Sequence, residues 1–405
     1  MPFLSRAELT HNTTTPDGQR SLDEAINIAY AIHAGSGFAD PFLAGLTGPS
    51  AHCAPLFPVV TAAIFSVFGA GTGGAIARDL LNIAGYSLLF SLLPVFAAGL
   101  GMTAAPGLAS GFAAAIYPYF GLSELTRGRD EWLAALMGMV LLLYALRIAR
   151  REELTRSAAV LYGAGWGALM YVHPAMVTIL PIHLLIILFA RKRGPAQLFS
   201  FAVISLAVFL LAILPWTIRN RVVMGGWMFM RDDLGLELEV SNGDGATASV
   251  IGNFASRRFC SIHPTCSPAA ALQVLEVGEL QFNRDAMAKA VSWIRSNPVS
   301  FSELTLRRAA AFWFGTVSKP MALLLSAALL LLGAAGLWMM WRTGLIIETS
   351  LLGALWIVYP LAFYLIQRVD RYQVPIYPAI LLPAGFASVT LYRNLRKSML
   401  SGSKN

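Results

Sequence analysis

The chain has 405 residues, of which 56% are hydrophobic and only 13% are charged. Ordinary globular domains carry about 25% charged residues, so this composition excludes a soluble protein and indicates one embedded in a membrane. The net charge of +8 comes from short Lys and Arg clusters between apolar runs. Such clusters set membrane topology, so the charge argues against nucleic acid as a partner.

The first segment, residues 1–52, is polar, and it includes the stretch SLDEAINIAYAI from residue 21 onward. Ser21 followed by Glu24 has the S-x-x-E pattern of a capping box, which predicts a helix start. The alternative is functional: Asp23 or Glu24 is a carboxylate held at the outer membrane face as a general base or electrostatic partner. No apolar signal-peptide core precedes these acids, which leaves their export unexplained.

Nine apolar runs come close to or exceed the length that crosses about 30 Å of hydrocarbon. A tenth segment, residues 53–69, is shorter and contains Pro55 and Pro58, so we favour an interfacial or re-entrant helix there. The sequence thus predicts an all-α polytopic membrane protein with nine or ten transmembrane helices. The nine predicted spans are 80–100, 104–121, 131–149, 157–173, 174–190, 197–216, 320–341, 347–366 and 373–392.

Basic clusters predict the orientation of these spans, because Lys and Arg favour the cytoplasmic side. The alternation of spans places four such clusters on that side, at 147–156, 191–193, 341–344 and in the C-terminal tail. We therefore expect four regions: an extracytoplasmic N-terminal loop with the acidic motif (1–52), a transmembrane core (53–216), an extracytoplasmic region (217–319), and C-terminal transmembrane helices with a cytoplasmic tail (320–405).

The region 217–319 is the one large polar insertion. Its apolar spacing predicts a helix over about 268–296 that Pro298 ends, followed by a second helix leading back to the membrane. Cys260 and Cys266 form either a disulfide, if the region faces an oxidising compartment, or two free thiols.

Several basic and aromatic residues could hold an anion at the outer face. Arg368, Arg371 and Tyr372 lie in a short loop between two spans, and arginine binds phosphate in a bidentate manner. The alternative there is an Arg–Asp pair with extended side chains that reach the interface. His52 either bonds a phosphate or simply lies at the membrane interface.

Motifs along nearly the whole chain resemble, in order, those of the bacterial membrane glycosyltransferases with the C-type fold. That group includes protein O-mannosyltransferases and the aminoarabinose transferases that act on lipid A. The segments that carry the resemblance are EAINIAYAIHAGSGFADPF, TGPSAHCAPLFPVVTAAIFSVFG, PWTIRN, HPTCS, GELQFNRDAMAKAVSWIRSNPVSF, RRAAAFWF and DRYQVPIYP.

The resemblance implies inverting transfer of a sugar from a polyprenyl-phosphate donor to a protein, lipid or glycan acceptor. Glu24 falls on the family's acidic position and implies the base, with Asp23 as second choice. Arg371 and Tyr372 fall on the R-Y positions that imply donor-phosphate contacts. The resemblance also implies a multi-pass protein of the bacterial inner (plasma) membrane with its site facing the periplasm or cell exterior.

Two departures from the family pattern stand out. The lipid A transferases carry a Lys before their Pro-Pro-Leu, whereas this chain has His52-Cys53-Ala54-Pro55-Leu56, so phosphate binding there would fall to His52 or to a residue elsewhere. A first spanning helix should also precede the acidic loop, and we expect the native start to lie upstream of Met1. No cofactor is implied, and one or two adjacent acids do not make a cation site, so the sequence does not support a metal.

Two other classes compete with a transferase. A transporter or flippase of a lipid-linked substrate predicts charged or broken positions in the middle of the bilayer, but Pro94 and Pro181 interrupt helices without acids nearby. A non-catalytic, truncated relative is the third reading.

Overall fold

The computed structural model describes residues 23–42, 47–116, 129–150, 154–190, 195–315 and 320–402. Within these ranges the regular structure is helical, and β pairing is confined to the isolated bridges Ala39–Pro49 and Ser249–Arg368. The prediction of an all-α polytopic protein is confirmed, since six helical segments are long and apolar enough to cross a membrane.

These six segments make up most of a helical bundle. They are α4 with α5 (Thr72–Ser91, Leu93–Gly99), α8 (Glu131–Arg150), α11 (Pro195–Met224), α18 (Pro320–Arg342), α19 with the 3-10 helix η2 (Ile346–Ile357, Tyr359–Tyr364), and η3 with α20 (Asp370–Ile376, Tyr377–Gly402).

The other three predicted spans are also helical, but they are shorter. They are α6 (Ala104–Ile116), α9 (Arg156–Val172), and η1 with α10 (Pro174–Ile179, Leu180–Ala190). The predicted span 104–121 extends past residue 116 into positions outside the described residues. Among the described residues, six helical segments qualify as spans by length and composition, against the nine or ten predicted.

Small residues bring the bundle helices close together. A Cβ atom at Gly336 of α18 would lie 1.8 Å from the carbonyl oxygen of Pro383 in α20, and one at Gly163 of α9 would lie 2.2 Å from that of Ser205 in α11. Such contacts exclude larger side chains at these positions and suit helices that pack in lipid, where association depends on close van der Waals contact.

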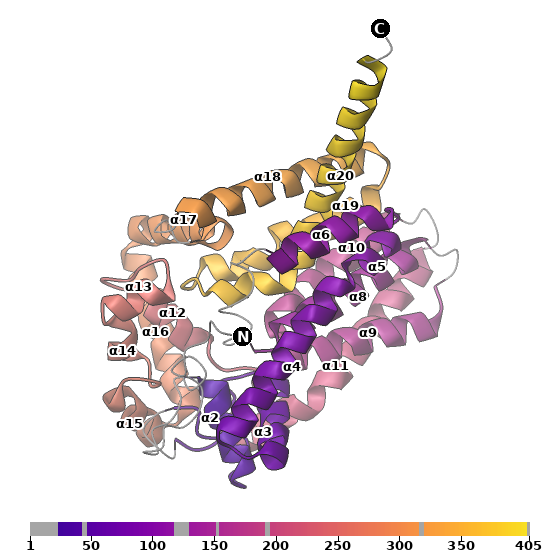
Figure 1. Cartoon of the computed structure of the whole chain (residues 1–405). Helices are drawn as coiled ribbons and strands as arrows, with labels where there is room; N and C mark the ends of the chain where they lie inside the picture. Colours follow the sequence, from indigo (N-terminus) through magenta and orange to yellow (C-terminus); the bar gives the residue numbers. More distant parts are fainter. Residues whose placement is uncertain are drawn as a thin grey trace.

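Short helices form a second body beside the bundle. They are α12 (Leu234–Ser241), α13 (Val250–Ala255), α14 (Arg258–Ile262), α15 (Pro268–Val277), α16 (Glu279–Ser296) and α17 (Pro298–Phe314). Their separate apolar core includes Phe42, Leu236 and Phe282. Figure 1 shows these helices on one side of the bundle, with α20 extending beyond it at the other end.

Three sequence predictions for this region are refined. The predicted helix over 268–296 is two helices, because Gly278 adopts a φ of 81° that favours glycine and breaks the run between α15 and α16. The membrane helix α11 continues to Met224, beyond its predicted end at residue 216. Cys260 and Cys266 are joined by a disulfide, which decides between the two alternatives.

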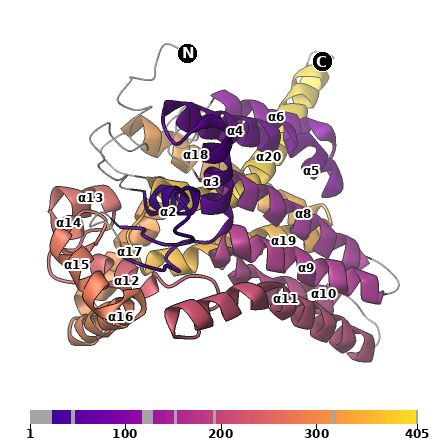
Figure 2. The same ribbon diagram turned by 90° about the horizontal axis from the view of Figure 1, so that it is seen from below.

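Helices α2 (Glu24–His33) and α3 (Leu56–Phe68) pack against each other around a small apolar core of their own. Both views place α2 between the short-helix body and the bundle (Figures 1 and 2). With 13 residues, α3 is about 20 Å long, which is shorter than the hydrocarbon layer. Its length agrees with the prediction of an interfacial or re-entrant helix for 53–69.

Candidate functional site

One pocket lies where the bundle, α2 and the short-helix body meet. Segments far apart in the sequence supply its walls: the start of α2, α3 and the loop before it, the start of α8, the end of α9, α12 and the loop before it, and η3. The lining residues are Glu24, Ala25, His52, Cys53, Ala54, Phe57, Pro58, Arg129, Asp130, Glu131, Val172, His173, Arg231, Glu237, Arg371 and Tyr372. The lining thus combines charged side chains with apolar ones.

Glu24 occupies the first position of α2, and its carboxylate points into the pocket. One oxygen accepts a hydrogen bond from the Thr265 hydroxyl at 2.7 Å, and the other lies 3.0 Å from the Arg129 guanidinium. Burial alone would raise the pKa of Glu24, but His263, Arg129, His52 and the bond from Thr265 outweigh burial and hold this pKa well below its ordinary value. Glu24 is therefore an anion at neutral pH.

Asp23 plays a different part from its neighbour. It is the N-cap of α2, where one carboxylate oxygen accepts from the backbone N–H groups of Ala25 and Ile26 at 3.0 and 3.2 Å. The other oxygen accepts from Nε of Arg129 at 3.1 Å. The predicted capping box that begins at Ser21 is thus wrong, because the helix starts later and Asp23 caps it. Asp23 does not line the pocket.

Three arginines converge on the pocket. Arg129 bridges Asp23 and Glu24, Arg231 donates to the backbone oxygen of His52 at 3.0 Å and pairs with Asp233, and Arg371 lies 3.1 Å from Glu131. Sequence reasoning selected Arg371 alone. Arg129 and Arg231 each stand beside acids, in GRDEW and RDDLG, and this adjacency was the available signal.

The other residues predicted to bind phosphate divide into two groups. Tyr372 and His52 line the pocket together with Arg371. Arg368 does not line it: its guanidinium pairs with Asp370 at 2.8 Å, and its backbone bonds Ala248 and Val250 in the bridge to the short-helix body. Arg368 therefore ties two parts of the fold together, and its role toward a donor phosphate stays a prediction.

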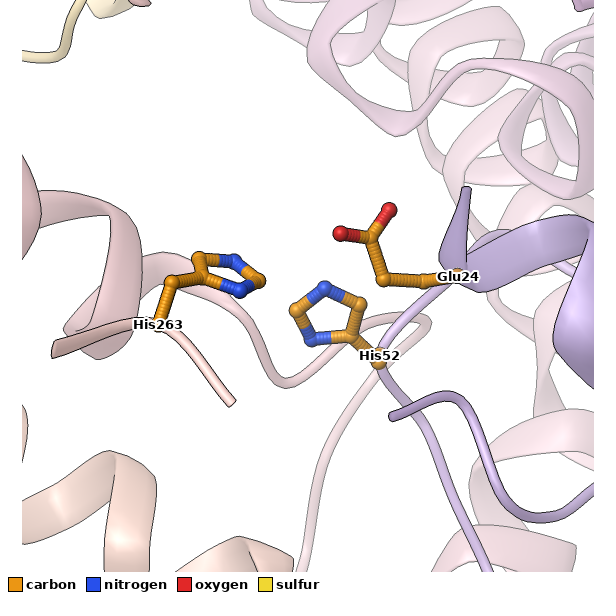
Figure 3. Close-up of side chains that lie close together, drawn as sticks. All are labelled: Glu24, His52 and His263. Atoms are coloured by element: carbon orange, nitrogen blue, oxygen red, sulfur yellow. The ribbon is translucent and has the colours of Figure 1, made fainter. Parts of the chain in front are cut away.

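Glu24, His52 and His263 form a compact cluster of metal-binding side chains. One ligand atom of each lies within 4.8 Å of the other two, and Figure 3 shows the three side chains directed toward a common point. His263 follows α14 and was missed from the sequence because more than 200 residues separate it from Glu24. Its Nδ1 accepts from the backbone N–H of Thr265 at 3.2 Å, which leaves Nε2 for a ligand.

The protonation of this cluster suits a cation. Burial first of all lowers the pKa of His52 to about 3 and that of His263 to about 4, so both imidazoles are neutral at pH 7. Two neutral imidazoles and one carboxylate are the donor set of many catalytic zinc sites. The sequence did not support a metal; this cluster is a candidate site that arises only in the folded chain.

Further acids line the pocket from other elements. Burial raises the pKa of Asp130 to about 7, with Glu131 adding to the effect, and burial likewise raises the pKa of Glu237 to about 7. These two carboxyls therefore exchange protons near neutral pH, whereas Glu24 does not.

Comparison with known proteins gives little further information. No family model matches the chain, and no curated protein matches it in sequence. Among solved structures, it is similar to the crystal structure of ArnT from Cupriavidus metallidurans in the apo state, at 16% identity and a TM-score of 0.36. The alignment covers 94% of this chain and 75% of that one. A similarity this weak shows neither activity nor substrate.

Proposed function

We propose that this chain is a membrane glycosyltransferase of the C-type fold that moves a sugar from a polyprenyl-phosphate donor to an acceptor. One observation carries the proposal: a single pocket at the junction of the bundle and the short-helix body holds Glu24 together with Arg129, Arg231 and Arg371. Such a transfer must bring together an anionic donor and a nucleophile. In this pocket the arginines would bind the donor, and the carboxylate would orient the nucleophile.

Arg231 and Arg371 are the proposed ligands of the donor phosphate. Arg371 uses Nε toward Glu131, and Arg231 uses Nε and one Nη toward His52 and Asp233. Each guanidinium has five N–H donors in a planar fork, so donors remain on both for phosphate oxygens. As the bond from sugar to phosphate breaks, the phosphate gains charge, and fixed cations stabilise that charge most in the transition state.

The apolar side chains of the pocket suit the other part of the donor, its isoprenoid chain. Phe57 and Pro58 from α3 and Val172 from the end of α9 line it. An isoprenoid chain attached to the bound phosphate would lie against these side chains and leave the protein toward lipid. Glu24, held as an anion, would accept a hydrogen bond from the acceptor and orient it for attack.

A divalent cation fits the same site. Glu24, His52 and Nε2 of His263 would hold it, and its charge would add to that of the arginines around the phosphate. The side chains that would hold the cation come from α2, the loop before α3 and the segment after α14, so binding would also fasten α2 to the short-helix body.

The proposed site faces the periplasm or cell exterior of a bacterial inner membrane. Helix α8 carries Glu131 of the pocket at its start and Arg147 and Arg150 at its end, and its 20 residues span about 30 Å. By the positive-inside rule, the basic end would lie in the cytoplasm and the pocket outside, together with the short-helix body. The disulfide Cys260–Cys266 supports an oxidising compartment for the short-helix body.

The test uses the full chain, purified into lipid nanodiscs and supplied with polyprenyl-phosphate sugars extracted from bacterial membranes. Release of polyprenyl phosphate, followed by mass spectrometry, reports transfer. We expect Glu24→Gln and Arg231→Gln to lower the rate on the order of 10²-fold or more, as for loss of a group that stabilises the transition state.

Matched controls separate the site from the surface. Glu303 and Arg307 form an exposed pair on α17, so Glu303→Gln and Arg307→Gln change the same residue types away from the pocket. Both controls should keep the wild-type rate. Full activity of Glu24→Gln and Arg231→Gln, or absence of release by the wild type with every donor, would contradict the proposal.

A further inference from the structure

Glu237 is a pocket carboxylate whose surroundings differ from those of Glu24. It lies on α12 and lines the same pocket. Its Oε2 accepts one long hydrogen bond, 3.4 Å from Nε2 of Gln367. None of the ion pairs found among the described residues includes Glu237, whereas Glu24 is bonded at 3.0 Å to Arg129. Glu237 thus borders the pocket without a cation that fixes its charge.

The charged groups that face Glu237 act in both directions. Burial is the main cause that raises its pKa to about 7, and the negative charges of Asp233 and Glu24 raise it further. Arg231 and the Gln367 hydrogen bond lower it in part. The phenol of Tyr372 is also close enough to interact with Glu237.

Lys289 and Arg258 lie on elements packed against α12, and both are engaged elsewhere. Lys289 of α16 pairs with Glu239 at 3.4 Å. Arg258 of α14 donates to the backbone oxygens of Val240 and Glu239. Neither cation neutralises Glu237, so its carboxyl can change protonation state without breaking an ion pair.

We propose that Glu237 takes the proton from the acceptor, while Glu24 remains an anion that orients the acceptor. This role rests on the proposed transferase function. The acceptor oxygen or nitrogen forms a bond to the anomeric carbon of the sugar, and the bond from that carbon to the phosphate oxygen breaks. The electron pair leaves with the polyprenyl phosphate, and the acceptor proton moves to a carboxylate oxygen of Glu237.

Gln367 is the positioning residue for this carboxylate. Its backbone N–H donates to the Ser241 hydroxyl at 2.7 Å, and its side-chain oxygen accepts from Nδ2 of Asn253 at 2.9 Å. These bonds turn the amide so that Nε2 points to Glu237. Because this donor favours the ionised carboxylate, removal of the Gln367 side chain makes Glu237 a weaker acid.

The experiment measures sugar transfer between pH 5 and pH 9 for wild type, Glu237→Gln, Gln367→Ala and the matched control Glu239→Gln. In the wild type the rate should rise with pH through about 7, where Glu237 loses its proton. Glu237→Gln should lose on the order of 10²–10⁴-fold at pH 8, together with this pH dependence. Gln367→Ala should move the rise to higher pH, and Glu239→Gln should match wild type.

If Glu237 had only a structural role, Glu237→Gln would lower the rate of transfer and leave the shape of its pH profile unchanged. Infrared spectroscopy adds a measurement that does not depend on activity. The protonated-carboxyl band that titrates near pH 7 in wild type contains Glu237 and Asp130, so it should lose the contribution of Glu237 in Glu237→Gln and keep that of Asp130. Transfer by Glu237→Gln with the wild-type rate and pH profile, or an unchanged carboxyl band, overturns the role of Glu237. Absence of transfer by the wild type overturns the proposed function instead.

Discussion

Asp23 and Glu24 are neighbours in sequence, yet the structure gives them separable tasks, and substitution of Asp23 tests this separation. Asp23→Ala removes the N-cap of α2, which costs about 1 kcal/mol, and a charge-assisted bond to Arg129, which costs about 2 kcal/mol. Both side chains are only 12% exposed, so solvent screens this pair little. The free energy of unfolding should fall by about 3 kcal/mol.

Asp23→Asn separates the two contributions. The Asn side-chain oxygen can still accept from the backbone N–H groups of Ala25 and Ile26, since Asn is a good N-cap. This variant should therefore lose only the charge-assisted part, about 2 kcal/mol. Because Arg129 keeps its bond to Glu24, Asp23→Asn should retain most of the transfer activity that Glu24→Gln loses.

Thermal unfolding can be followed with a dye that reacts with thiols. Cys53 is buried at the pocket, and the other two cysteines are joined in a disulfide, so the dye reports exposure of Cys53. The unfolding midpoint should fall from wild type to Asp23→Asn to Asp23→Ala. Asp285→Asn, at a half-buried position of α16 where the Asn oxygen can still accept the hydrogen bond from Nε2 of Gln281, should melt as wild type does. An Asp23→Asn protein with the wild-type midpoint and no transfer would refute the reasoning, because Asp23 would then act in catalysis.

Three further predictions follow from single contacts. Arg308→Gln should lower the free energy of unfolding by about 3–5 kcal/mol, because the fully buried guanidinium donates to three oxygens of other elements. The same dye measures this change, and an unfolding midpoint equal to that of wild type would contradict the prediction. Mass spectrometry of the native protein should find Cys260 and Cys266 oxidised. Reduction of this disulfide should lower the free energy of unfolding by about 2 kcal/mol, because the loop that it closes is short. Alkylation of both thiols without a reductant would contradict the prediction. Purified protein should bind zinc. His52→Ala should weaken zinc binding at least about tenfold, whereas substitution of the exposed His33 by Ala should not. Equal zinc affinity of the two variants would exclude the cluster as a site.

Sequence by itself determined the class of protein and the approximate positions of its long apolar helices. Long apolar runs are stable only away from water, and in lipid a chain satisfies its backbone hydrogen-bonding groups by forming helices. The composition therefore predicts a helical bundle without knowledge of how the helices pack. The resemblance to C-type glycosyltransferases implied Glu24, Arg371 and Tyr372 as site residues, and all three line the pocket.

Only the tertiary structure decided which residues share that pocket. Arg129, Arg231, Glu237 and His263 each stand in ordinary polar segments, and they gain a common environment when distant helices pack. Local sequence also does not separate Asp23 from Glu24: the start of α2 turns one carboxylate back to cap its own helix and the other into the pocket. Such side-chain directions follow from where a helix begins and what it packs against, and these depend on contacts between residues hundreds of positions apart.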